Sequence, residues 1–152
     1  MSGIFGSFKT TASALTAQRL RMDVISNNIA NAETTRTANG GPYRRQQVVF
    51  VAKDNPQSFA SHLAVASRKR ELEAPGQGVE VSQIVADDSP GNKVYDPSHP
   101  DADEDGFVTY PNVNVVTEMT DMLSASRSYE ANVTVFNALK SMALKAIELG
   151  NK

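Results

Sequence analysis

The sequence contains no cysteine and no tryptophan, and it has only two histidines in 152 residues. Without cysteine, the chain forms no disulfide framework, no cysteine-ligated zinc site and no thiol nucleophile. His62 and His99 lie far apart in the sequence and lack the short spacing of metal-ligand pairs. The sequence therefore predicts no cofactor and no resident metal of the usual kinds.

Charge and hydropathy exclude further classes of protein. The chain carries 15 basic and 17 acidic residues, and a formal net charge of −2 argues against a dedicated nucleic-acid binder. No apolar run approaches the ~18 residues of a membrane-spanning helix, and no cleaved secretory signal is recognisable. Ser98, His99 and Asp96 are too close together in a proline-rich loop to form a catalytic relay. We expect no enzymatic activity and no small-molecule substrate.

The strongest pattern is the placement of glycine and proline, the residues that most often interrupt regular structure. Neither occurs from Ser7 to Asn39 or from Asn112 to Leu149. All nine glycines and seven prolines lie at the extreme ends or between Gly40 and Pro111. The chain is predicted to form a helical segment over 1–32, a β/loop-rich middle over 33–111 and a second helical segment over 112–152.

Both predicted helices carry apolar seams. In the first, large apolar residues recur every seven positions after a candidate N-cap at Ser7, and the helix is expected to end near Ala30. In the second, which Pro111 and Asn112 would start and Gly150 would end, steps of four and three run from Val115 to Ile147. These seams predict a mainly α protein whose two helices pair as an antiparallel coiled coil around a small β-containing middle.

The middle region contains short strand signals. Arg44–Lys53 has a β-branched centre, which predicts a strand. In Gly78–Ala86 the alternation of apolar and polar residues is regular at first and then shifts, which predicts a strand with a bulge or a bend. Shorter extended segments are expected at Lys93–Tyr95 and Phe107–Tyr110. Residues 55–75 are polar and form a variable segment, either a loop or a short helix.

One loop resembles the start of a calcium-binding loop. Asp101, Asp103 and Asp105 alternate before Gly106, as hard-cation ligands do. The twelfth position is Asn112 instead of the bidentate glutamate, and two prolines exclude an entering helix. A solvated acidic loop is therefore favoured over a calcium-modulated binding module, which stays open as an alternative function.

Several stretches of the sequence form a specific combination of motifs. The first is Ser26–Ala32 (SNNIANA), and it is followed by Pro42–Arg45 (PYRR), Val94–Asp103 (VYDPSHPDAD) and Tyr110–Asn114 (YPNVN). The last motif leads through Glu118 to Ser124–Tyr129 (SASRSY). Together these stretches resemble the flagellar axial proteins of the rod and hook. The loop VYDPSHPDAD favours a proximal rod protein, and another rod subunit of the same family is the nearest alternative.

The resemblance implies a non-enzymatic subunit of the bacterial flagellar basal body. Such subunits stack helically into a rod that crosses the periplasm, transmits torque and encloses the export channel. They leave the cytoplasm through the flagellar type III apparatus without a cleaved signal. The implied partners are copies of the chain, other rod proteins and the export-gate adaptor at the rod base.

The residues expected to take part in assembly are the large seam residues and the amides of the SNNIANA stretch, whose side chains would fix the register of neighbouring helices. They are Phe8, Leu15, Met22, Asn27, Asn28, Ile29, Asn31, Met119, Met122, Tyr129, Val133, Phe136 and Ile147. The longer second helix is expected to bury the rest of its stripe against other subunits.

Overall fold

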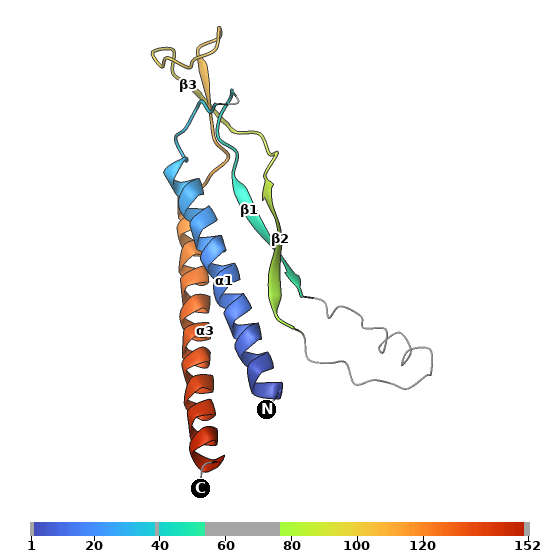
Figure 1. Ribbon diagram of the computed structural model, residues 1–152. Coiled ribbons are helices and arrows are strands. Elements are labelled where there is room, and N and C mark those ends of the chain that lie inside the picture. Colours follow the sequence, from blue (N-terminus) through green and yellow to red (C-terminus); the bar gives the residue numbers. More distant parts are fainter. Residues whose placement is uncertain (1, 39, 54–76, 151–152) are drawn as a thin grey trace, which may run out of the picture.

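Two long helices lie side by side and run in opposite directions, so that both ends of the chain lie at the same end of the molecule (Figure 1). The computed structural model describes residues 2–38, 40–53 and 77–150. Helix α1 spans Ser2–Ala30, and helix α3 spans Val115–Gly150. The expected variable segment over 55–75 falls outside the described residues.

Helix α1 begins earlier than the sequence predicts. Ser7 is not its N-cap, because the helix already starts at Ser2. Gly3 and Gly6 are accommodated in the first two turns. At the other end, the backbone N–H of Asn31 donates to the Asn27 carbonyl at 3.1 Å, and the Asn31 side chain adds a second bond to the same oxygen at 2.9 Å. The expected end near Ala30 is confirmed.

Helix α3 begins later than predicted. Pro111 and Asn112 lie before the helix, and Asn114 is its N-cap. The Asn114 Oδ1 atom accepts the N–H groups of Val116 and Thr117 at 3.0 and 3.2 Å. Proline thus ends the preceding extended segment, and the asparagine three residues later starts the helix. The expected end at Gly150 is confirmed.

The middle of the chain forms two separate two-stranded antiparallel sheets. Strand β1 (Gln46–Ala52) pairs with β2 (Val79–Ala86), and the register shift between Val49 and Phe50 leaves Ser82 as the extra residue of a bulge. Strand β3 (Asn92–Tyr95) pairs with β4 (Phe107–Tyr110). The four strands and the bulge agree with the sequence-based prediction. The second hairpin lies at the end of the molecule away from the termini (Figure 1).

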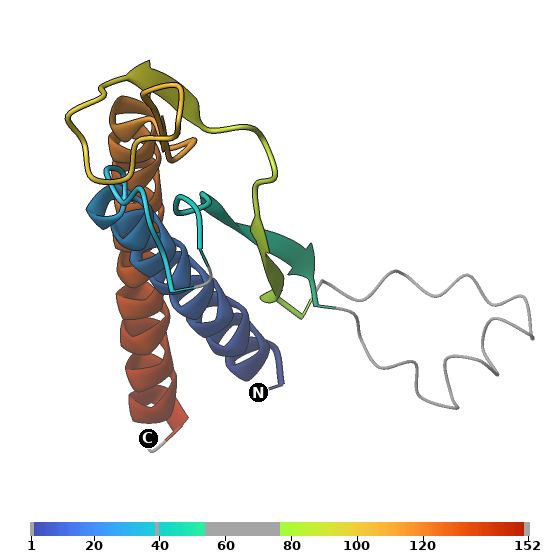
Figure 2. The same cartoon turned by 90° about the horizontal axis from the view of Figure 1, so that it is seen from above.

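Helix α1 lies between α3 and the β1–β2 hairpin (Figures 1 and 2). Its most buried apolar side chains, Ala17, Val24 and Ile25, therefore face two neighbours. The predicted heptad seam lies beside this most buried face of α1. Its side chains are only partly buried, and they are Phe8, Leu15, Met22 and Ile29. The Phe8 ring contacts the Phe136 ring edge to face, with centroids 5.1 Å apart.

Gly78, directly before β2, lies at a close approach of the hairpin to α1. Its φ is +109°, and a Cβ atom there would lie 2.2 Å from the Ser13 Oγ atom. That same oxygen accepts the N–H of Val79 at 3.1 Å and donates to the Thr10 carbonyl at 2.7 Å. Backbone conformation and close packing both require glycine here.

We expect Gly78→Ala to lower the free energy of unfolding by about 2 kcal/mol, because the methyl group adds a steric conflict to an unfavourable φ. Gly41→Ala is the matched control, since Gly41 also has a positive φ (+76°) but has open space around it. Urea unfolding followed by circular dichroism measures both variants. An equal loss in the two would show that the approach to Ser13 contributes nothing.

Candidate functional site

Asn28 lies at the centre of a buried polar cluster where α1, α3 and the start of β1 meet. Its side chain is 1% exposed. The amide nitrogen donates to the Gln46 carbonyl at 2.8 Å and to Glu118 Oε2 at 2.9 Å. The amide oxygen accepts the N–H of Gln46 and the hydroxyl of Tyr43, both at 2.9 Å. The amide thus pairs with the backbone of Gln46 much as a neighbouring strand would.

Glu118 is the acidic partner in this cluster and is also 1% exposed. Its Oε1 atom accepts a hydrogen bond from Arg45 Nε at 2.6 Å, while Oε2 accepts the bond from Asn28. Both carboxylate oxygens therefore have partners, which is the condition for a buried charge to be tolerated.

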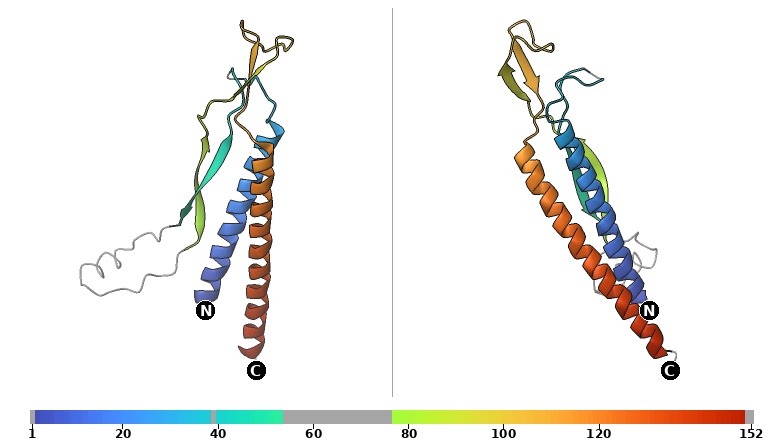
Figure 3. Two further views of the ribbon diagram at one scale, coloured as in Figure 1. Left: turned by 180° about the vertical axis from the view of Figure 1, so that it is seen from behind. Right: turned by 90° about the vertical axis from the view of Figure 1, so that its left-hand side faces the viewer.

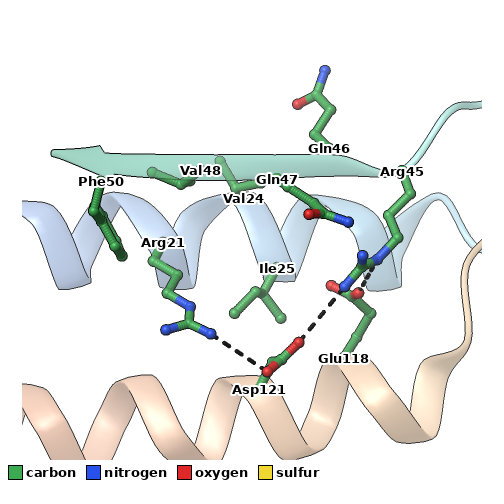
Figure 4. Close-up of a pocket in the computed structure, with 10 residues that line it drawn as sticks. All are labelled: Arg21, Val24, Ile25, Arg45, Gln46, Gln47, Val48, Phe50, Glu118 and Asp121. Atoms are coloured by element: carbon green, nitrogen blue, oxygen red, sulfur yellow. Dashed lines mark hydrogen bonds and ion pairs between the residues drawn. The ribbon is translucent and has the colours of Figure 1, made fainter. Parts of the chain in front are cut away.

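A chain of charges continues from Glu118 toward the surface (Figure 4). The Arg45 guanidinium lies 3.6 Å from Asp121 Oδ2, and the Arg21 guanidinium lies 3.4 Å from Asp121 Oδ1. Arg21 belongs to α1 and Asp121 to α3, so the chain bridges the two helices. We call the connected residues the polar junction. They are Arg21, Asn28, Tyr43, Arg45, Glu118 and Asp121.

Tyr43 closes the junction on the side of the loop before β1. Partial burial and the negative charge of Glu118 raise the pKa of its phenol above the ordinary value of 10.0. The hydroxyl therefore keeps its proton at neutral pH and can donate to Asn28 Oδ1.

A cleft of about 220 Å³ opens beside the junction, between β1, α1 and α3. Its walls combine the charged groups with Val24, Ile25, Val48 and Phe50 (Figure 4). Its arginines are already paired with carboxylates, so the cleft presents no free charge cluster of the kind that would activate a substrate.

The predicted amide residues have different environments. Asn28 enters the junction, whereas the Asn27 side chain is exposed and reaches the Tyr43 hydroxyl at 3.4 Å. Asn31 Nδ2 binds Asn27 Oδ1 at 3.0 Å, and Asn31 Oδ1 accepts the Thr34 hydroxyl at 3.2 Å. Asn27 and Asn31 thus lie at the end of the helix, and among the three asparagines Asn28 is the one that bonds to α3.

The predicted seam residues of α3 also fall into two groups, one partly buried and one exposed. Met122, Tyr129, Val133 and Phe136 are partly buried. Met119 and Ile147 are exposed, at 56% and 60%, on this single chain. The fully buried positions of α3 are Glu118 and Ala125.

The acidic loop uses its carboxylates for local hydrogen bonds. Asp101 accepts the Thr35 hydroxyl at 2.7 Å and lies 3.8 Å from the Arg36 guanidinium. Asp103 Oδ1 accepts the N–H groups of Asp105 and Phe107 at 3.1 and 2.8 Å. Over residues 2–38, 40–53 and 77–150, no three His, Asp or Glu side chains gather as a metal site would require. A calcium-modulated module is not favoured.

Sequence reasoning missed five of the six members of the polar junction. They are Arg21, Tyr43, Arg45, Glu118 and Asp121. One signal was available, because Glu118 stands one turn before Met122 on the face of α3 that carries the seam. A glutamate on an apolar face calls for a buried cationic or amide partner.

Two family models match the chain. The model for flagella basal body rod proteins matches residues 8–36, and the model for the C-terminal region of flagellar basal body rod FlgEFG proteins matches residues 104–149. These matches cover most of α1 and nearly all of α3. They define the class of protein as that of flagellar rod subunits.

Curated relatives narrow the class. The chain is 51% identical over 150 residues to the flagellar basal-body rod protein FlgC of Bacillus subtilis, with 96% of this chain and 97% of the relative covered. It is 48% identical to FlgC of Borreliella burgdorferi, with 97% of each covered. It is 43% identical to FlgC of Escherichia coli, with 94% and 95% covered. The chain belongs to the FlgC family of flagellar basal-body rod proteins.

This membership confirms the predicted role as a structural subunit of the flagellar basal-body rod, and motility follows from that role. Among the described residues, no helix is long and apolar enough to cross a membrane.

Proposed function

We propose that the chain assembles helically with copies of itself and with other rod proteins, and that it does so by burying apolar surface of α3 against its neighbours. In this proposal α1 and α3 pair as an antiparallel coiled coil around the middle region 33–111. The subunit carries force and lines an export channel, and it catalyses no reaction.

The observation that carries the proposal is the uncovered end of α3. Phe8 contacts Phe136, so in an antiparallel pair Ser2 lies level with Met142, because both stand six residues further toward the free ends. Residues 143–150 then extend past α1 by ~12 Å, at 1.5 Å per residue. Figure 3 shows this extension in both views.

The extension is apolar and exposed. Leu144, Ile147 and Leu149 are 53%, 60% and 76% exposed. Apolar groups that cluster on one exposed element are typical of an interaction surface. Contacts between different patches of identical subunits produce open helical assemblies when the rotation does not close.

The polar junction supports this assembly indirectly. Asn28 connects α1 to both α3 and β1, so the two helices are held in one register. Fixed register keeps the uncovered stripe of α3 facing outward in every copy. A single buried asparagine has this role in coiled coils.

Family membership supports the rest of the proposal. The subunit would stand in the periplasmic rod and leave the cytoplasm through the flagellar type III apparatus without a cleaved signal. Its partners would be neighbouring rod proteins and the export-gate adaptor at the rod base.

The double variant Leu144→Asp/Ile147→Asp tests the proposal. Both side chains are exposed on the single chain, so we expect the chain to fold while two buried charges prevent assembly. In a strain that lacks the native gene, motility in soft agar and the yield of isolated basal bodies should both fall to background. Asn137→Asp adds charge at an exposed position elsewhere on α3 and should preserve both. Normal rods from the double variant would refute the proposal.

A further inference from the structure

The outward faces of the two helices complement each other. On α3 a second set of positions, separate from the seam that faces α1, follows steps of four and three. It contains Ala131, Val135, Ala138 and Met142, and all four are exposed. At about 100° per residue this face lies roughly 120° around the helix from Phe136. The β1–β2 hairpin lies against α1 and leaves this face of α3 uncovered.

Helix α1 also has a regular outward face. Phe5, Ala12 and Arg19 recur every seven residues, and Asp23 follows on the same side. All four are exposed, and Phe5 is 71% exposed. Neither α3 nor the hairpin covers them, because the buried positions of α1, such as Val24 and Asn28, lie on the opposite side.

We infer that the outward face of α1 in one copy packs against the outward face of α3 in a neighbouring copy, with both copies pointing the same way. This inference rests on the proposed helical assembly and specifies its lateral contact. The helices then run antiparallel across the contact, as α1 and α3 do within one chain. Each copy contributes a different face to each of its two contacts, so the contact repeats from copy to copy and gives an open helical assembly when the rotation does not close.

Charge selects the register. Asp23 and Arg127 are exposed, and neither has an ion-pair partner within the described residues. When Ala12 lies opposite Ala138 of the neighbouring copy, Asp23 lies level with Arg127, at the edge of the exposed α3 face. Opposite charges then meet across the contact.

The same register matches side-chain size. Ala12 meets Ala138 of the neighbouring copy, and two small residues permit close approach of the helices. Phe5 lies level with Lys145, whose ammonium can rest on the aromatic ring. A shift of seven residues in either direction would place Asp23 opposite Thr120 or Thr134 and remove its basic partner.

The absence of cysteine permits a direct test by disulfide cross-linking. In the Ala12→Cys/Ala138→Cys chain, the two cysteines lie on the outer faces of their own helices and meet only between copies. We expect mild oxidation of isolated basal bodies to give a ladder of dimers and larger species on a non-reducing gel. In the control Ala12→Cys/Ala131→Cys, the second cysteine lies seven residues along α3 from position 138, ~10 Å away, and this chain should give no ladder. Intact rods without a ladder, or equal ladders from both pairs, would overturn the inference.

A charge exchange supplies a second readout. We expect Asp23→Arg to reduce intact basal bodies by about tenfold, because like charges then face each other across the contact. Adding Arg127→Asp to the same chain should restore them. Absence of rescue counts against the register. If these variants and the cysteine pairs fail while Leu144→Asp/Ile147→Asp still abolishes rods, the lateral contact is wrong and the proposed function stands.

Discussion

Replacing Asn28 with alanine should lower the free energy of unfolding by about 4 kcal/mol, the largest effect of any single change considered for this chain. The substitution removes four hydrogen bonds at a position that is 1% exposed. It leaves the carbonyl and N–H of Gln46 and one oxygen of Glu118 without their partner. The small cavity that forms adds to the cost.

Two measurements check this prediction. Urea unfolding monitored at 222 nm gives the loss of stability, and hydrogen exchange of the peptide around Gln46 reports the freed N–H. Asn27→Ala is the matched control, because Asn27 is the adjacent amide and its side chain is exposed. It should cost less than about 1 kcal/mol. Similar losses for the two variants would mean that the SNNIANA asparagines act only as helix formers and caps.

The overall architecture could be predicted because the glycines and prolines that interrupt regular structure lie only at the extreme ends and in the middle of the chain. The end of α1 at Ala30, the end of α3 at Gly150 and the bulged β2 strand all follow from local rules. The helix starts were wrong because local signals competed there. Ser7 resembles an N-cap, yet Gly6 before it does not stop the helix, and Asn114 caps α3 in place of Asn112.

The seam on α1 was only partly predicted, for a geometric reason. A seven-residue repeat identifies the face that meets one partner helix. Helix α1 has two neighbours, and its most buried side chains, Val24 and Ile25, lie where α3 and the hairpin converge. The sequence gives no indication that the β1–β2 hairpin folds back along α1.

The polar junction could be anticipated only in part. The unusual run of asparagines indicated a role in register, and Asn28 has the contacts that such a role requires. Its partners Gln46 and Glu118 lie 18 and 90 positions away along the chain. Pairing over those separations depends on the tertiary fold, and local periodicity carries no information about it.

Glu118→Gln carries the second largest expected effect, a loss of about 3 kcal/mol. The variant keeps the shape of the side chain, but its amide has one acceptor oxygen where the carboxylate has two. Arg45 Nε and Asn28 Nδ2 both donate to the carboxylate, so one of them must then face an N–H₂ group. Glu148→Gln, at an exposed position on the same helix, should change stability by less than about 0.5 kcal/mol.

A double-mutant cycle with Arg45→Leu separates the ion pair from the rest of the junction. Arg45→Leu alone leaves Glu118 buried with one unpaired oxygen, and the Arg45 N–H keeps its bond to Asn112 Oδ1 at 3.0 Å. In the Arg45→Leu/Glu118→Gln chain no charge is left without its partner. The double variant should therefore lose at least about 1.5 kcal/mol less than the sum of the single variants. Additive losses would show that Glu118 acts through Asn28 alone, and the ion pair would then have no part in joining the hairpin to the two helices.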